Sequence, residues 1–296
     1  MAANTNDDLH IIDQMLTERA PRLLRSRWWP LLGPLRDAFF GYHKARRMAD
    51  AIAPLGGQEA LDYISELLGL EVLAEGLHHL PPSGACVVVC NHPTGIADGI
   101  AVFDALKQVR GDLRFLANAD AQRICPRFDD VLIPVVWPPA KRNVRSTKVA
   151  LRMARAALQQ QKALVIFAAG LMSKHIDGRL QDPPWEHSAV ALARKHAVPL
   201  VPLHVAGPYS LLFHLFHRLS QELRDITLFH EFMNKAGRRF TLRLGPTIDV
   251  TALEQTTNEA LTVSLKHYVE RVLPEELDLP FLDSPSYVPI DRKKLC

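Results

Sequence analysis

A histidine and an aspartate stand six residues apart where an apolar run gives way to a polar loop. Residues 86–90 are rich in valine, and the loop after them carries His92, Gly95 and Asp98. A turn through Gly95 lets the chain bend back, so that the Asp98 carboxylate can reach the His92 ring. A carboxylate that fixes the imidazole tautomer leaves the other ring nitrogen able to take a proton from a hydroxyl. The spacing predicts a general base; the alternative is a pair that only caps the loop.

Short apolar runs flanked by glycine and proline must position this loop. They predict strands at residues 70–74, 85–90, 113–117, 131–137, 163–167, 199–206 and 239–244. Helical spacing of apolar residues predicts helices at 100–109, 143–160, 187–196, 208–232 and 261–273. Because strands alternate with helices, we expect an α/β fold whose sheet is mostly buried and flanked by helices.

The residues before this region read as helices interrupted by prolines and by Gly56-Gly57. Residues 19–47 hold eight basic side chains against one acid, together with Trp28, Trp29 and Tyr42. Cations beside interfacial aromatics are typical of a segment that lies on anionic lipid. We therefore expect residues 1–69 to form a helical membrane-docking layer, 70–273 the α/β domain, and 274–296 an extended tail.

Composition excludes several classes of protein. A net charge of +3 over 296 residues is too small to indicate a nucleic-acid partner. Residues 1–14 lack an apolar stretch, so we expect no signal peptide, and no run of about 18 apolar residues predicts a spanning helix. The four cysteines form no C-x-x-C pair and the thirteen histidines no His-Glu-x-x-His motif, so we expect neither a metal nor a cofactor.

The segment Asn91-His-Pro-Thr-Gly-Ile-Ala-Asp-Gly99 resembles the first motif of the glycerolipid (lysophospholipid) acyltransferase superfamily, and most of all its putative hemolysin and ornithine-lipid acyltransferase branch. Four further segments resemble that branch in the same order: residues 115–118, 132–135 with 141–145, 165–173 and 198–204. The resemblance covers roughly residues 70–210. It implies the superfamily's α/β fold and an acyltransferase in which His92 is the base and Asp98 its partner.

The resembling motifs also indicate where substrates would bind. We expect contacts with acceptor or donor from a set of residues in the first three motifs: Asn91, Thr94, Gly95, Arg142, Arg145, Gly170, Ser173 and Lys174. Arg142 and Arg145 could clamp an anionic headgroup, or they could be a solvated helix start. Backbone donors near Gly95 or Gly170 would stabilise the oxyanion. The third motif usually carries a glutamate, whereas Ala169 and Leu171 stand at those positions here.

The resemblance implies transfer of a fatty acyl group from acyl-CoA or acyl-carrier protein to the hydroxyl of a lysolipid, either 1-acylglycerol-3-phosphate or lyso-ornithine lipid. The enzyme would be peripheral, on the cytoplasmic face of the membrane, and would act in phospholipid metabolism. Two alternatives remain open. One is a hydrolase that uses the same dyad on water, and the other is a non-catalytic lipid-binding protein, which the missing glutamate favours.

Overall fold

The computed structural model describes residues 9–25, 41–136, 143–176, 179–208, 221–253 and 255–286. Contacts divide the chain into two compact units, each assembled from three stretches of sequence. The first unit consists of Met1–Leu70, Asp120–Asp130 and Pro208–Arg238. The second consists of Glu71–Ala119, Val131–Gly207 and Arg239–Cys296.

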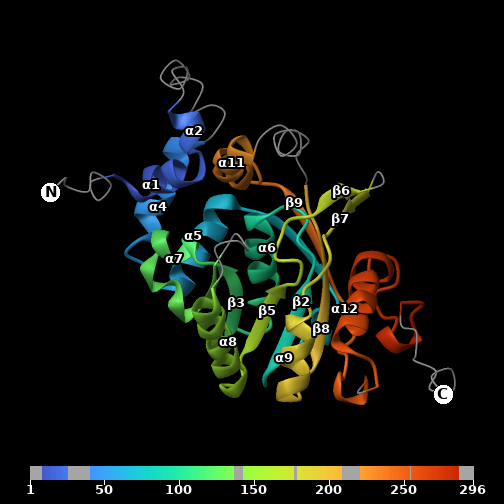
Figure 1. Cartoon of the computed structure of the whole chain (residues 1–296). Helices are drawn as coiled ribbons and strands as arrows, with labels where there is room; N and C mark the ends of the chain where they lie inside the picture. The colour runs from blue at the N-terminus through green and yellow to red at the C-terminus, as the bar shows by residue number, and fades with distance from the viewer. Residues whose placement is uncertain are drawn as a thin grey trace. The chain divides into compact units, whose positions relative to one another are not determined.

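The second unit is built on a seven-stranded sheet (Figure 1). In chain order the strands are β1 Glu71–Glu75, β2 Cys86–Cys90, β3 Leu113–Asn118, β4 Leu132–Val135, β5 Ala163–Phe167, β8 Leu200–Ala206 and β9 Arg239–Leu244. Their spatial order is β1-β9-β8-β2-β5-β3-β4, and only the β8–β9 pair is antiparallel. The central strand β2 is fully buried on both faces, as expected for a parallel sheet covered by helices. The α/β fold predicted from the sequence is confirmed.

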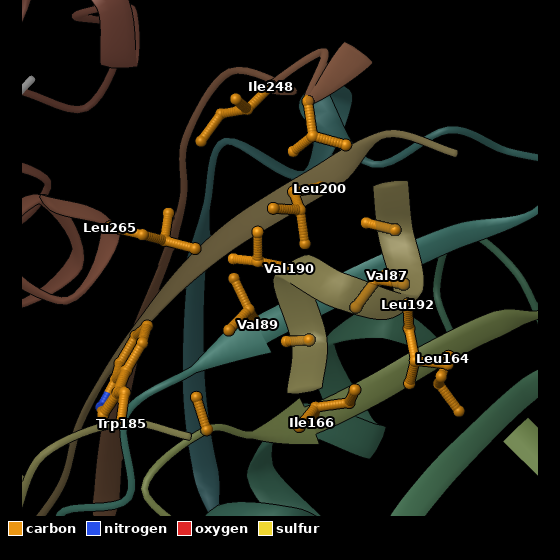
Figure 2. Packing of buried hydrophobic residues seen from close by; sticks show 14 of the residues in the cluster. Val87, Val89, Leu164, Ile166, Trp185, Val190, Leu192, Leu200, Ile248 and Leu265 are labelled. Atoms are coloured by element: carbon orange, nitrogen blue, oxygen red, sulfur yellow. The ribbon is translucent and has the colours of Figure 1, made fainter. Parts of the chain in front are cut away.

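Helices cover both faces of this sheet. They are α6 Ile96–Leu106, α8 Val144–Gln159, α9 Ser188–His196 and α12 Asn258–His267, which continues as the π-helix η6 Tyr268–Val272. Val87 and Val89 of β2 pack with Leu164 of β5 and Val190 of α9 in one large apolar cluster (Figure 2). Burying such side chains stabilises the fold by about 1.5–3 kcal/mol each. This core fixes the strand end that leads to His92.

Short elements fill the rest of the second unit. The 3₁₀ helices are η2 Leu77–His79, η5 Thr251–Leu253 and η7 Phe281–Asp283. A hairpin of β6 Lys174–Ile176 and β7 Arg179–Gln181 was not predicted, because such brief strands carry too few residues to show a period. The tail differs from the extended segment we expected. Its described part contains turns and η7, and the Phe281 side chain is buried against Tyr268.

The first unit is helical in its described residues. Its elements are α1 Ile11–Arg19, α2 Pro21–Leu24, α4 Tyr42–Ile52, α5 Gly57–Leu68, α7 Asp120–Ile124, η3 Pro126–Asp130 and α11 Gln221–Met233. Ile12 of α1, Ala45 of α4 and Phe229 of α11 share one buried cluster. The helix expected at 208–232 is therefore described only from Gln221 onward, and it runs on to Met233.

The segment expected to meet the membrane, residues 19–47, is described at 19–25 and 41–47. Within these parts, Arg19 is ion-paired with Asp120 at 2.5 Å and Arg46 with Asp13 at 3.4 Å. Tyr42 is buried in the first unit's core rather than exposed. Trp28 and Trp29 lie outside the described residues. Across the described ranges no helix is long and apolar enough to cross a bilayer, and membrane docking stays a prediction.

Candidate active site

His92 sits two residues beyond the carboxyl end of β2. The preceding Asn91 anchors this position, since its side chain exchanges two hydrogen bonds with the main chain of Val205 in β8. The Asn91 amide donates to the Val205 carbonyl at 2.9 Å, and the Val205 N–H donates to the Asn91 amide oxygen at 2.7 Å. Asn91, predicted to contact substrate, is thus buried and holds two neighbouring strands in register at the site.

His92 and Asp98 form a hydrogen-bonded pair, as the sequence spacing predicts. The His92 Nδ1 atom lies 2.8 Å from Asp98 Oδ2, and the Asp98 side chain has no exposed surface. Because Asp98 only accepts when ionised, Nδ1 carries the proton and Nε2 has a free lone pair. The His92 side chain retains 19% of its exposure, so a substrate hydroxyl can approach. This arrangement can perform general base chemistry at Nε2.

Asp98 is held by the loop that it closes. Its carboxylate accepts hydrogen bonds from the Thr94 N–H at 2.9 Å, the Thr94 hydroxyl at 2.6 Å and the Gly95 N–H at 3.0 Å. Asp98 also lies in the first turn of α6, where the helix dipole favours a negative charge. Gly95 takes φ +99°, a conformation that other residues rarely adopt. These three hydrogen bonds and the one to His92 hold the Asp98 carboxylate in place beside the imidazole ring.

A second carboxylate, Asp182, supports the main chain of His92 and was not predicted. Asp182 is 2% exposed and accepts hydrogen bonds from the His92 N–H, the Ser173 hydroxyl and the Trp185 indole N–H. Burial raises the pKa of Asp182 above its ordinary value, although the Ser173 and Trp185 donors oppose that shift. The Ser173 N–H in turn donates to the His92 carbonyl at 2.8 Å. One buried group therefore joins the first and third motifs.

The network continues into the π-helix. The Asp182 N–H donates to the Glu270 carboxylate at 2.8 Å, and Lys266 donates to the other Glu270 oxygen. π-helical turns are rare and often occur at functional sites. On its other side, the His92 ring lies against the Phe167 ring, with 4.4 Å between the centroids. The only sequence signal for Asp182 was its place before two prolines and a tryptophan, which is too common to indicate a role.

The structure brings only some of the other residues predicted to bind substrate to the dyad. Thr94, Gly95 and Ser173 lie at the dyad, with their polar groups engaged in the hydrogen bonds above. The Gly170 N–H donates to the Phe167 carbonyl within a turn, so neither this N–H nor that of Gly95 is available for an oxyanion. Arg145 and Lys174 are exposed and are not brought to the dyad by any hydrogen bond within the described ranges. Arg142 lies outside the described residues.

Metal-ligating side chains gather elsewhere. In the part of the chain that the structure describes, the one group with suitable spacing is His78, His79 and Asp278. His78 and His79 belong to η2 and Asp278 precedes η7, and the group includes neither member of the dyad. The His92–Asp98 pair offers a single free nitrogen, which suits proton transfer better than metal binding.

Comparisons with known proteins indicate the family to which the chain belongs. The chain matches a family described as acyltransferase over residues 15–276. A lyso-glycine lipid O-acyltransferase of Phocaeicola vulgatus is 28% identical over 211 residues, covering 69% of this chain and 74% of the relative. Another of the same name, from Bacteroides thetaiotaomicron, is 24% identical over 211 residues, covering 69% and 75%.

A solved structure shares the fold. The 1-acyl-sn-glycerophosphate acyltransferase PlsC of Thermotoga maritima superposes with a TM-score of 0.50 at 16% identity, over 83% of this chain and 96% of that one. At this identity the match concerns the architecture alone. The family match, in contrast, spans both the dyad and the Asp182 network. The chain therefore belongs to the acyltransferase family.

Proposed function

We propose that this enzyme transfers a fatty acyl group from a thioester, acyl-CoA or acyl-carrier protein, to the hydroxyl of a lysolipid through the His92–Asp98 dyad. The observation that carries the proposal is the hydrogen bond between His92 Nδ1 and a fully buried Asp98. It leaves Nε2 as a base at the carboxyl end of β2, an edge where parallel sheets commonly bind ligands.

In the proposed reaction, the acceptor's own hydroxyl is the nucleophile. Nε2 of His92 takes the hydroxyl proton while the oxygen attacks the thioester carbonyl. Asp98 stabilises the imidazolium that forms. The tetrahedral intermediate then expels the thiolate, and His92 returns the proton to that sulfur. The ester and the free thiol are the products, so no protein nucleophile is required.

The acceptor is proposed from the relatives and from the third motif. Both curated relatives are named for a lyso-glycine lipid. Ala169, which stands where the superfamily usually has glutamate, is 6% exposed and packs in the apolar core. We therefore place a lysolipid with an amino-acid headgroup, lyso-glycine or lyso-ornithine lipid, ahead of 1-acylglycerol-3-phosphate. Exposed cations of the predicted docking segment, including Arg22, Lys44 and Arg47, would hold the enzyme on anionic lipid.

Radiolabelled palmitoyl-CoA and palmitoyl-loaded acyl-carrier protein, each offered with the three lysolipids in separate reactions, test this proposal. Labelled diacyl lipid, absent with boiled enzyme, is the expected product, and it is expected to form fastest with an amino-acid lysolipid. Release of labelled fatty acid in place of diacyl lipid would identify a hydrolase. Lysolipid binding with no turnover of either donor would identify a non-catalytic lipid-binding protein.

A further inference from the structure

Helix α8 carries four cations and no acid. Its sequence, VRSTKVALRMARAALQ, places Arg145, Lys148, Arg152 and Arg155 at intervals of three or four residues. At about 100° per residue, these side chains fall within a sector of about 80° and extend over about 15 Å of helix. All four are exposed. We call these four residues the α8 cationic stripe.

The stripe lies opposite the face by which α8 packs. The buried residues of the helix are alanines and one leucine, and they join the second unit's core: Ala150, Ala154, Ala157 and Leu158. This face contacts β4, β5 and α9. The stripe therefore faces away from the sheet, and the exposed apolar side chains of Val144 and Leu151 flank it. A row of cations flanked by exposed apolar side chains is suited to binding another protein.

In the part of the chain that the structure describes, no carboxylate forms an ion pair with the stripe. By contrast, Arg123 and Arg239, on other elements, are paired with Glu18 and Glu71. Like charges three and four residues apart destabilise a helix, so this pattern has a cost that an anionic partner would offset. The pKa of His196 on neighbouring α9 is lowered by burial first and then by Arg155 and Lys195. The positive region thus extends beyond α8.

The direction of the stripe indicates which anionic partner fits. Strands β2, β5, β3 and β4 are parallel, so α8, which follows β4 in the chain, begins near the carboxyl edge of the sheet (Figure 1). His92 follows β2 at the same edge. The stripe begins at that edge with Arg145 and runs away from it along one face of the sheet. A flat membrane that covered the site's edge would not also cover this face. A protein on this face could reach the site with a flexible arm.

Building on the proposed function, we infer that the stripe docks the acidic surface of an acyl-carrier protein, whose thioester-bearing arm then extends to His92. Charge complementarity of this kind increases the rate of encounter and depends on salt. Acyl-CoA has no protein surface to dock on the stripe, so we expect transfer from acyl-CoA not to require Lys148, Arg152 or Arg155.

Binding of unacylated holo acyl-carrier protein, measured by fluorescence anisotropy, tests the docking surface without turnover. Arg152→Glu and Arg155→Glu are each expected to weaken binding by about tenfold or more. Arg238→Glu is the matched control, since it makes the same charge change at an exposed arginine outside α8, and it is expected to leave binding unchanged. Equal binding by all four proteins would overturn the inference.

Kinetics and lipid binding give the second test. The KM for palmitoyl-loaded carrier protein is expected to rise in Arg152→Glu, while kcat/KM with palmitoyl-CoA stays within about twofold. If Arg152→Glu instead lost binding to phosphatidylglycerol vesicles and kept carrier binding, the stripe would be a membrane surface and the inference wrong. If the wild type bound the carrier through the stripe but transferred no acyl group, the proposed function would fail and the docking surface would stand.

Discussion

Asp182 shows how a single buried carboxylate can position a catalytic side chain that it does not touch. Its three donors come from the first motif, the third motif and Trp185, and its partner His92 is 90 residues away in sequence. His92 and Asp98 could be predicted because they stand on one short loop whose spacing is visible in the chain. Asp182 could not, because its role arises only when β2 and the β7–α9 connection lie side by side.

Replacing Asp182 with asparagine tests this role. The amide keeps the shape of the side chain but turns one acceptor into a donor, which then faces the His92 or Trp185 N–H. We expect kcat to fall by about tenfold to a hundredfold, because a small displacement of the base is costly. Steady-state assays check this, with intrinsic tryptophan fluorescence, to which Trp185 contributes, as a readout of the site. Asp278→Asn, an exposed aspartate of the same unit, serves as the control, and an unchanged kcat in Asp182→Asn would contradict the proposed role.

At the scale of elements, the start of α6 determines how His92 meets Asp98. The helix begins at Ile96 because Gly95 turns the chain and the Asp98 side chain accepts a hydrogen bond from the Gly95 N–H. The apolar runs predicted β2 and β5 closely, since five consecutive apolar residues leave few alternatives. The β6–β7 hairpin escaped prediction because its six strand residues are mixed in polarity and have no alternation to detect.

Gly95→Ala is predicted to disturb this start, and Gly99→Ala is its matched control. A Cβ at Gly95 would lie 2.6 Å from Met172 Sδ, and φ is +99°. We expect a loss of stability of about 1–3 kcal/mol and a reduced kcat. A Cβ at Gly99 meets nothing within 4 Å, and alanine in a helix is favoured by about 1 kcal/mol. Denaturant unfolding and kcat distinguish the two, and similar behaviour of both variants would contradict the account.

At the scale of the whole molecule, the sequence predicts the fold class but not the assembly. Alternating strands and helices indicated a buried sheet, and local pattern could not order it as β1-β9-β8-β2-β5-β3-β4. Local patterns also could not predict which residues form the first unit, because residues 120–130 and 208–238 join the N-terminal stretch from distant parts of the sequence. The resemblance to known motifs, rather than periodicity, indicated the superfamily.

A pH dependence of global stability follows from His204 in β8. Burial, followed by nearby Arg243, lowers the pKa of His204 to about 4, although its bond to the Val269 carbonyl opposes the shift. The unfolded chain binds this proton near pH 6.5. The contribution of His204 to the free energy of unfolding is therefore fully present above about pH 6.5 and is lost as the pH falls toward about 4. This contribution is at most about 3 kcal/mol. His204→Asn, which can still donate to Val269, should flatten that part of the unfolding profile, and an unaltered slope would contradict it.

The central claim is that His92 is the base for acyl transfer, and the kcat of His92→Ala with the best donor and acceptor tests it most directly. Because the variant keeps Asp98, Asp182 and the backbone hydrogen bonds of the loop, circular dichroism should show the wild-type fold. The account predicts a fall in kcat of about a thousandfold or more, since no other base replaces Nε2. A folded His92→Ala enzyme that retains kcat within about tenfold of wild type would contradict the account.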